Sequence, residues 1–344
     1  MAKKETEVTE IKESKNFGNV IGTLQEMNLK LDNDYEVTLD TGKKVKCKAI
    51  VKEDFKNPSI TIDVNGTPIG VNYFPTAEVT KKNEENKGFK SMMTVLENYI
   101  DKVHATDEKP ATRLKANCKL GLNEYVNDKE ELSSFPQLMG QFQPTSTNVP
   151  EKDIVEVEIS GVVRAIKDET KGEDGDTTGR LLVTFFMFDN KGALKPFELV
   201  VEEDLAEDFK EIYEVGCSCK LYIELISKTV GVVKVKKSGG MGRHESNISS
   251  GYEKIELSVF KGEDPIEDDD EGVDKDYFVS MADVKTAMKE RDIWIEAKKK
   301  DKKDNPKGKG KSTTKSKGLG TRPSSIQEDL PFDEESTDIE DPFS

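Results

Sequence analysis

The sequence predicts a mainly β protein with two five-stranded barrels, each with a helix, followed by a C-terminal helix and a disordered tail. Alternating apolar and polar residues recur along 17–261, as in half-buried strands. In each half an early strand contains a glycine, Gly22 or Gly161, and a helical pattern separates the third strand from the fourth. These features are typical of the OB barrel, whose first strand bends to serve both sides of the barrel. A generic β-sandwich is the alternative.

The first half contains five strand-like segments and one helical segment. The strands are expected at 19–29, 35–51, 59–74, 111–126 and 134–144, and the helix at 89–103. A turn at Thr41-Gly42 and a hairpin at Asn65-Gly66 divide two of these segments. The expected apolar faces contain Val45, Cys47 and Ala49 in one strand, Leu114, Ala116, Cys118 and Leu120 in another, and Met92, Met93, Val95, Leu96, Tyr99, Ile100 and Val103 in the helix.

The second half repeats this order after a linker-like stretch. Strands are expected at 153–166, on both sides of a turn at Asn190-Lys191-Gly192, and at 217–226, 230–237 and 252–260, with a helix within 203–216. A further helix is expected at 281–299, with Ser280 as its N-cap and Val284, Ala287, Met288, Arg291 and Ile295 on one face.

These segments define the expected parts of the chain. They are a flexible N-terminus (1–15), an OB-like domain (16–143), a linker (144–152), a second OB-like domain (153–261), an acidic loop and helix (262–299), a basic flexible linker (300–325) and an acidic protein-interaction tail (326–344).

The charge is unevenly distributed. The net charge of the 344-residue chain is -16, yet residues 298–322 hold eleven Lys or Arg and only two Asp. Residues 323–344 hold eight acidic residues and no Lys or Arg. The remaining body is therefore strongly acidic. This argues against a protein that coats duplex DNA by bulk charge, but it leaves room for a local basic groove.

The sequence offers no catalytic, metal or cofactor motif, so we expect no enzyme and no cofactor. The four cysteines form no CxxC pair and are joined by only two histidines, which disfavours zinc and disulfides and favours reduced thiols, with Cys47 and Cys118 as small core residues. The stretch at 308–313 lacks the spacing of a phosphate loop, and the acidic stretch from Glu267 lacks the final Glu of an EF-hand loop. Without a secretory signal or a long apolar run, we expect a cytoplasmic protein.

Cations and aromatic rings lie close together on several predicted strands. Single-stranded DNA binding needs cations that follow the phosphates and rings on which bases stack. The candidate DNA-binding residues are Lys44, Lys46, Lys48, Tyr73, Phe74, Arg113, Lys115, Lys119 and Tyr125 in the first half, and Arg164, Arg180, Phe186, Phe188, Lys195, Phe197, Tyr222 and Lys234 in the second. Solvated lysine faces and buried core rings are the alternative interpretation.

The C-terminal tail contains two Pro-Phe pairs among acids. In "EDLPFDEESTDIEDPFS" the candidate partner-binding residues are Asp329, Leu330, Pro331 and Phe332, and Asp341, Pro342 and Phe343. A terminal Phe can anchor in an apolar pocket while acids pair with a basic rim, and an acidic tail can occupy a basic groove when DNA is absent. A charged tail that only improves solubility is the alternative.

This layout resembles the single-stranded-DNA-binding proteins of bacteria and phages, in which an OB body precedes an acidic tail ending in Asp-Ile-Pro-Phe. "EDLPF" matches that tip best but is internal, whereas "EDPFS" is terminal but lacks the aliphatic residue and adds Ser344. The body is similar to larger two-barrel forms from phages and mobile elements of Gram-positive bacteria, in segments such as "SFPQLMGQF", "EVEISGVVRAI" and "KPFELVVEE".

The resemblance implies sequence-independent single-stranded DNA binding without catalysis, in replication, recombination or repair. Its partners would be single-stranded DNA and proteins recruited by the tail, in a bacterial cytoplasm and without a membrane. An adaptor whose barrels mainly bind protein is the alternative, and the acidic body favours it. An OB-containing nuclease would need a ligand cluster, which the sequence does not offer.

Overall fold

The computed structural model describes residues 11–52, 59–171, 175–230, 252–267 and 277–304. In chain order the elements are β1 (Asn16–Asn28), β2 (Lys30–Thr38), β3 (Lys44–Val51), β4 (Ser59–Val64), β5 (Thr67–Asn72), β6 (Thr76–Ala77), α1 (Lys87–Asn98), β7 (Arg113–Val126), β8 (Leu132–Gly140), β9 (Ile154–Lys171), β10 (Asp176–Phe188), β11 (Leu194–Val201), α2 (Glu203–Ile212), β12 (Ser218–Val230), β13 (Tyr252–Gly262) and α3 (Met281–Asp304). Within these residues no helix combines the length and the apolar character needed to span a bilayer.

Each half of the chain closes into a five-stranded barrel with the OB order of strands. In barrel 1 the order is β1-β4-β5-β8-β7, and β7 pairs back with β1; in barrel 2 it is β9-β10-β11-β13-β12, and β12 pairs back with β9. The third and fifth strands of each barrel, β5 with β8 and β11 with β13, run parallel. Helix α1 or α2 lies between the third and fourth strands, which confirms the predicted fold class.

The two predicted bending glycines lie where the first strand of each barrel changes partners. Gly22 is the point at which β1 passes from β7 to β4, and a Cβ there would lie 2.2 Å from the carbonyl oxygen of Asp63. Gly161 is the matching point of β9, where a Cβ would lie 2.1 Å from the carbonyl oxygen of Phe186. Only glycine allows the neighbouring strand to approach so closely.

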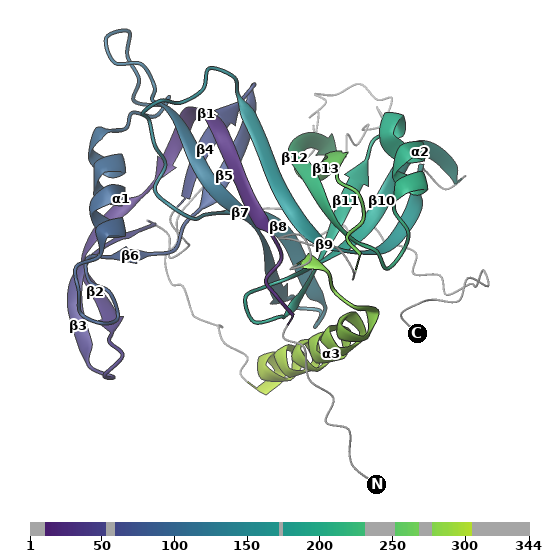
Figure 1. Cartoon of the computed structure of the whole chain (residues 1–344). Helices are drawn as coiled ribbons and strands as arrows, with labels where there is room; N and C mark the ends of the chain where they lie inside the picture. Colours follow the sequence, from purple (N-terminus) through teal and green to yellow (C-terminus); the bar gives the residue numbers. More distant parts are fainter. Residues whose placement is uncertain (1–10, 53–58, 172–174, 231–251, 268–276, 305–344) are drawn as a thin grey trace, which may run out of the picture.

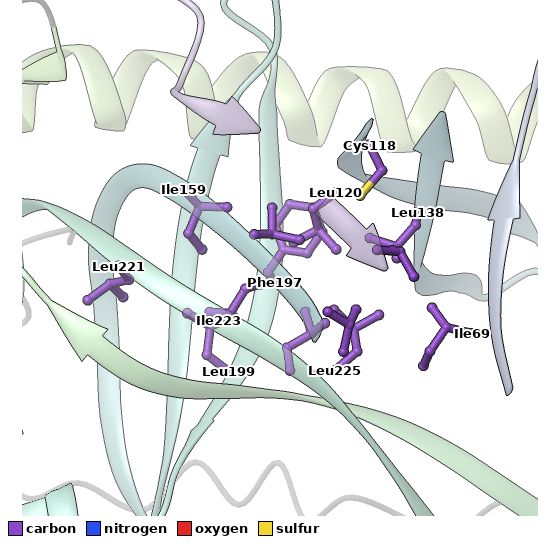
Figure 2. Packing of buried hydrophobic residues seen from close by; sticks show 14 of the residues in the cluster. Ile69, Cys118, Leu120, Leu138, Ile159, Phe197, Leu199, Leu221, Ile223 and Leu225 are labelled. Carbon is purple, nitrogen blue, oxygen red and sulfur yellow. The ribbon is translucent and has the colours of Figure 1, made fainter. Parts of the chain in front are cut away.

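The barrels are joined edge to edge through β1 and β9, which pair antiparallel from Asn16↔Ile159 to Ile21↔Ile154. The result is one ten-stranded sheet (Figure 1). Its buried side chains form one hydrophobic cluster that runs from Ile69 and Cys118 in barrel 1 to Leu199 and Ile223 in barrel 2 (Figure 2). Because the strands alternate, the even-numbered residues from Leu114 to Leu120 point into this core as predicted.

An inserted arm corrects one part of the predicted barrel. Strands β2 and β3 are inserted between the first and second strands of barrel 1, and they project away from the barrels in Figure 1. Together with β6, which follows the third strand β5, they form a separate three-stranded sheet. Residues 44–51 were expected to form a barrel strand, but they form β3, which belongs to the sheet of the arm. Cys47 is accordingly half-buried on the arm and not a core residue, whereas Cys118 is fully buried.

Three further expectations concern ends of elements. The turn residues Asn65 and Gly66 both have positive φ, 52° and 85°, which confirms the hairpin between β4 and β5. Helix α1 ends before Tyr99, so Ile100 and Val103 lie outside it, and Val103 is exposed. Residues 11–15 were expected to be flexible, but the backbone N–H of Ser14 donates to the carbonyl of Phe188 over 2.9 Å, and Ile11 packs on barrel 2.

Helix α3 begins at the predicted residue and lies against both barrels (Figure 1). The Ser280 hydroxyl accepts from the Asp283 N–H over 3.2 Å and donates to the Asp283 carboxylate over 2.7 Å, which confirms the N-cap. Val284 and Ala287 are buried in a second cluster with Phe186, Phe188 and Leu194 of barrel 2. The expected strand at 230–237 lies almost wholly outside the described residues.

Candidate nucleic-acid interface

One face of barrel 1 carries aromatic and amide side chains and no acidic side chain. It consists of the outward positions of three adjacent strands, β5, β8 and β7, and of the residues that follow β5 and β8. The face contains Pro68, Gly70, Asn72 and Phe74 from β5, Phe135, Gln137, Met139 and Gln141 from β8, and Arg113, Lys115, Asn117, Lys119, Gly121, Asn123 and Tyr125 from β7. We call it the acid-free face.

Two positions of this face, Gly121 and Gly70, carry no side chain. A Cβ on Gly121 would lie 3.0 Å from Cγ of Met139, so the β8 side chains lean over β7 there. At Gly70 a Cβ would meet no atom within 4 Å, so the surface above β5 is open. The face is therefore accessible to an extended chain.

Exposed aromatic rings lie at the two ends of β8. Tyr125 and Phe135 form an edge-to-face pair with ring centroids 6.2 Å apart and an interplanar angle of 72°. Both rings are about half exposed, as expected for a site at which a base could stack. At the other end of β8, Phe74 is 68% exposed and Phe142 is 62% exposed. Tyr125 and Phe74 were predicted site residues; Phe135 and Phe142 were missed.

Phe74 and Phe142 line the same hollow, whose volume is about 240 Å³. Gln141, Gln143, Thr76 and Gly88 complete its walls, and Tyr73 and Met92 close it from the core side. The parallel pairing of Asn72 with Met139 brings the two segments side by side as they leave the sheet. Phe74 and Phe142 thus lie side by side because each follows one of two paired parallel strands. The spacing of residues in the sequence does not show that these two strands pair.

Four predicted stacking rings lie in the core, and that prediction was wrong. Tyr73, Phe186, Phe188 and Phe197 are each at most 6% exposed, so no base can reach their faces. The side chains of β10 alternate between two buried surfaces. As a result Phe185 faces the barrel interior, whereas Phe186 and Phe188 are covered by α3. Burial also raises the pKa of the Tyr73 hydroxyl, which has no hydrogen-bond partner among the described residues.

The three predicted lysines of β3 belong to the arm and not to the barrel surface. Lys44 lies 2.6 Å from Glu36, and Lys46 lies 3.5 Å from Asp34, across the β2–β3 hairpin. The hydrogen bond to Glu36 raises the pKa of Lys44. Lys48 is exposed on the same strand. The arm is thus a mixed-charge surface apart from the acid-free face.

Several predicted cations are held by carboxylates or carbonyls. Arg113 donates to Asp153 over 2.5 Å and to the carbonyls of Pro150 and Glu151, so it fastens the connection between the barrels. Lys119 lies 2.9 Å from Glu13. Lys115 is half-buried and has no acidic partner within the described part of the chain. It is the β7 cation best placed to meet a phosphate.

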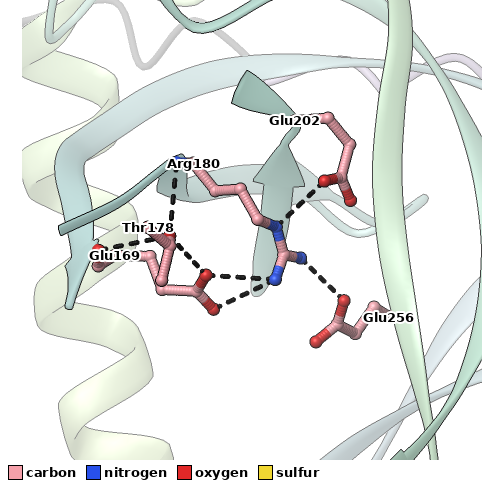
Figure 3. A network of polar contacts seen from close by, with 5 residues as sticks. All are labelled: Glu169, Thr178, Arg180, Glu202 and Glu256. Atoms are coloured by element: carbon pink, nitrogen blue, oxygen red, sulfur yellow. Dashed lines mark hydrogen bonds and ion pairs between the residues drawn. The ribbon is translucent and has the colours of Figure 1, made fainter. Parts of the chain in front are cut away.

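Arg180 was predicted to bind DNA, but its guanidinium is the centre of a structural ion-pair network (Figure 3). It lies 3.0 Å from Glu169, 3.1 Å from Glu202 and 2.7 Å from Glu256, and its side chain is only 15% exposed. Burial alone would lower the pKa of Arg180, but the hydrogen bond to Glu256 and the three carboxylates raise it. The network joins β9, β10, β13 and the N-cap of α2, so the guanidinium is enclosed by carboxylates.

The remaining predicted residues of barrel 2 are also engaged. The Tyr222 hydroxyl donates to Glu263 over 2.5 Å, which raises the pKa of that hydroxyl, and Lys261 lies 4.6 Å from the ring centroid. Arg164 is half-buried on β9, and it is not free of partners. Lys195 pairs with Glu124 of barrel 1 and lies 5.5 Å from the ring centroid of Trp294.

Lys234 and the seven candidate tail residues lie outside the described residues, and so do most of the basic linker and the acidic tail. Among the described residues, His, Cys, Asp and Glu form no group that could hold a metal ion.

A sequence model described as YorF matches residues 14–301, which span both barrels and most of α3. No curated protein sequence matches the chain. The wild-type single-stranded DNA binding protein from Thermus aquaticus is structurally similar, with 12% identity and a TM-score of 0.41 over 76% of this chain and 98% of that one. A deletion variant of the same protein has 12% identity and a TM-score of 0.39 over 74% and 97%. Because both TM-scores are low, the assignment of the fold depends on the strand pairings of this chain.

Proposed function

The chain belongs to the YorF family along both barrels and most of α3, and we propose that these parts act as one body that binds single-stranded DNA without catalysing a reaction. The binding is largely independent of sequence, and the strand lies on the acid-free face of barrel 1. OB barrels commonly bind oligonucleotides across their surface strands and the loops beside them.

The observation that carries this proposal is the charge of that face. The chain has 68 Asp and Glu residues, yet β5, β7 and β8 together contain a single one, Glu124. The side chain of Glu124 is 4% exposed and is held by Lys195 and Arg291, so it presents no charge to a ligand. A polyanion is repelled by most of this body, and the acid-free face is where that repulsion is weakest.

The rings on the face supply the second part of the argument. A base stacked on an aromatic side chain contributes roughly 1–3 kcal/mol, and every base has a face that can stack. Phe74, Tyr125 and Phe135 are exposed on this face, whose polar groups are mainly amides, and Phe142 is exposed beside it. Stacking of this kind favours unpaired strands over duplex, in which the base faces are already covered.

The acidic tail and the resemblance to bacterial and phage single-stranded-DNA-binding proteins support a finer proposal. Residues 326–344 recruit replication, recombination or repair proteins through Leu330-Pro331-Phe332, through Pro342-Phe343, or through both. The tail also competes with DNA for basic groups. The setting is the cytoplasm of a bacterial host, and the origin is a phage or a mobile element.

The test is a titration of the full chain with fluorescent oligo-dT and with matched duplex at several salt concentrations. We expect tight oligo-dT binding that weakens as salt rises, with little duplex binding. Removal of 326–344 should leave or increase DNA affinity and abolish capture of partners. Absence of oligo-dT binding by both forms would overturn the proposal, and weaker DNA binding without the tail would contradict the competition model.

An adaptor that mainly binds protein is the second candidate, because α2 is markedly acidic. Its first turn contains Glu203 and Asp204, and Lys210 is already paired with Asp168 over 2.8 Å. Such a surface suits a basic protein partner better than a nucleic acid. The same titration separates the two candidates, since the adaptor predicts no salt-sensitive binding of oligo-dT.

A further inference from the structure

We infer that the hollow between Phe74 and Phe142 is a slot for one unpaired nucleobase. This inference rests on the proposed function and deepens it, because it assigns one part of the acid-free face to a single base. The hollow of about 240 Å³ has exposed rings on its rim and a buried floor. An aromatic base fits those chemical requirements: flat faces for stacking and polar edges for amides.

The rim is held in place by backbone contacts and not only by side-chain packing. The Thr76 hydroxyl donates to the carbonyl of Phe74 over 3.1 Å, which fixes the turn that presents the Phe74 ring. The backbone N–H of Gln141 donates to the carbonyl of Asn117 over 3.0 Å, which fixes the segment that leads to Phe142. Both rings are thus exposed on ordered segments.

The floor of the hollow includes Gly140 and the ring of Tyr73. A Cβ at this position would lie 2.1 Å from the Tyr73 ring, so the ring lies directly against the backbone of β8. Met92 of α1 closes the hollow beside it. Tyr73 is therefore a structural part of the slot and not a stacking partner, which explains why it lies beside exposed rings and is itself buried.

The walls of the hollow carry neutral polar groups that could form hydrogen bonds with the polar edge of a base. Gln141 and Gln143 each offer an amide donor and acceptor, and Thr76 offers a hydroxyl oxygen. No lining residue is acidic. Gly88 belongs to the first turn of α1, which contains no acidic residue and begins with exposed Lys87. A phosphate attached to the bound base would therefore meet no carboxylate in the hollow or in this turn.

Barrel 2 lacks this slot at the equivalent place. Its parallel strands β11 and β13 are followed by Glu202, Glu203 and Asp204, and by Glu263 and Asp264, without an aromatic residue among them. The two barrels have the same strand order, so this difference comes from the residues alone. We conclude that the slot is specific to barrel 1.

The experiment uses the full chain and oligo-dT that carries one 5-iodouracil, with affinity and photocrosslinking as separate measurements. Expected results are a crosslink to Phe74 or Phe142, and an affinity loss on the order of tenfold or more in the Phe74→Ala, Phe142→Ala double variant. Phe142→Trp should retain binding. Phe260→Ala, which removes a partly exposed ring of barrel 2, is the matched control and should stay within twofold of the parent.

The outcomes distinguish this inference from the proposed function. If the parent binds oligo-dT but the double variant stays within twofold and the crosslinks lie elsewhere, the slot is wrong and the proposed function stands. If the parent binds no oligo-dT, both are overturned. Thermal unfolding of each variant checks the fold, and exposed rings should be removable without a large change in stability.

Discussion

Lys195 of barrel 2 donates to Glu124 of barrel 1 over 3.2 Å, and this ion pair joins two parts of the chain that are 71 residues apart. Arg291 of α3 binds the other oxygen of the same carboxylate and also donates to the carbonyl of Leu194 over 3.0 Å. Barrel 1, barrel 2 and α3 therefore meet at one carboxylate. The cluster keeps Glu124 away from the acid-free face although its neighbour Tyr125 belongs to that face.

Replacement of Glu124 by Ala should destabilise the protein by about 3–5 kcal/mol, because two cations would be left without their buried partner. Glu130→Ala is the matched control, since Glu130 is half exposed and pairs with Lys303 at the surface. A surface pair contributes about 0–1 kcal/mol. Urea unfolding monitored by the single tryptophan, Trp294, measures both changes. Equal small losses in the two variants would show that Glu124 does not hold the parts together.

Gly161→Ala should destabilise barrel 2, because the new Cβ would lie 2.1 Å from a backbone oxygen and 2.8 Å from the Phe185 ring. Overpacking of this kind costs about 1–3 kcal/mol. Gly70→Ala is the control: no atom lies within 4 Å of its Cβ position, and its backbone conformation suits alanine. Thermal unfolding should lower the Tm of the first variant and leave that of the second nearly unchanged. A similar Tm for both would contradict the assigned role of Gly161.

The order of elements could be predicted because local signals agree with the global fold. Gly22 and Gly161 mark the bend of each first strand, Asn65-Gly66 marks a hairpin, and Ser280 marks the start of α3. The arm could not be recognised in the same way. Residues 44–51 alternate like a barrel strand, and alternation does not reveal which sheet a strand joins.

The candidate site was harder to predict than the fold, because exposure and pairing depend on residues far apart in the chain. Arg180 resembles a DNA-binding cation until Glu256, 76 residues away, is brought against it. Phe186 and Phe188 resemble stacking rings until α3 covers them. Phe142 lies in an expected strand, at 134–144, but nothing in that pattern showed that its ring is exposed beside Phe74.

Asp63 should make the stability of barrel 1 depend on pH. The hydrogen bond from Lys102 lowers the pKa of Asp63 below its ordinary value of 3.8, and the Gly66 N–H donates to the same carboxylate over 2.7 Å. Because the pKa is lower in the folded state, ionised Asp63 stabilises the fold above its ordinary pKa, and this contribution is lost as the pH falls through the folded pKa.

Asp63→Asn should therefore be less stable than the parent at pH 7 and should lose less stability between pH 5 and pH 2. Lys102→Ala should have a similar effect, and the double variant should add little, because both changes remove one interaction. Urea unfolding at a series of pH values provides the measurement. Parallel curves for parent and Asp63→Asn would contradict the assignment.

The Tyr125–Phe135 pair should bind bases at the end of β8 opposite to the hollow. Between Phe135 and Gly140 the strand advances about 17 Å at roughly 3.3 Å per residue, so a DNA strand that touched both ends of β8 would need several nucleotides. Tyr125→Ala combined with Phe135→Ala should weaken binding of a long oligo-dT by about 1–3 kcal/mol per stacked base lost. It should have little effect on an oligonucleotide short enough to occupy only the Phe74 end.

Fluorescence anisotropy with a series of oligo-dT lengths gives both comparisons, with Phe260→Ala as the control for loss of an exposed ring. If the loss is the same at every length, the two ends of β8 do not form one continuous track.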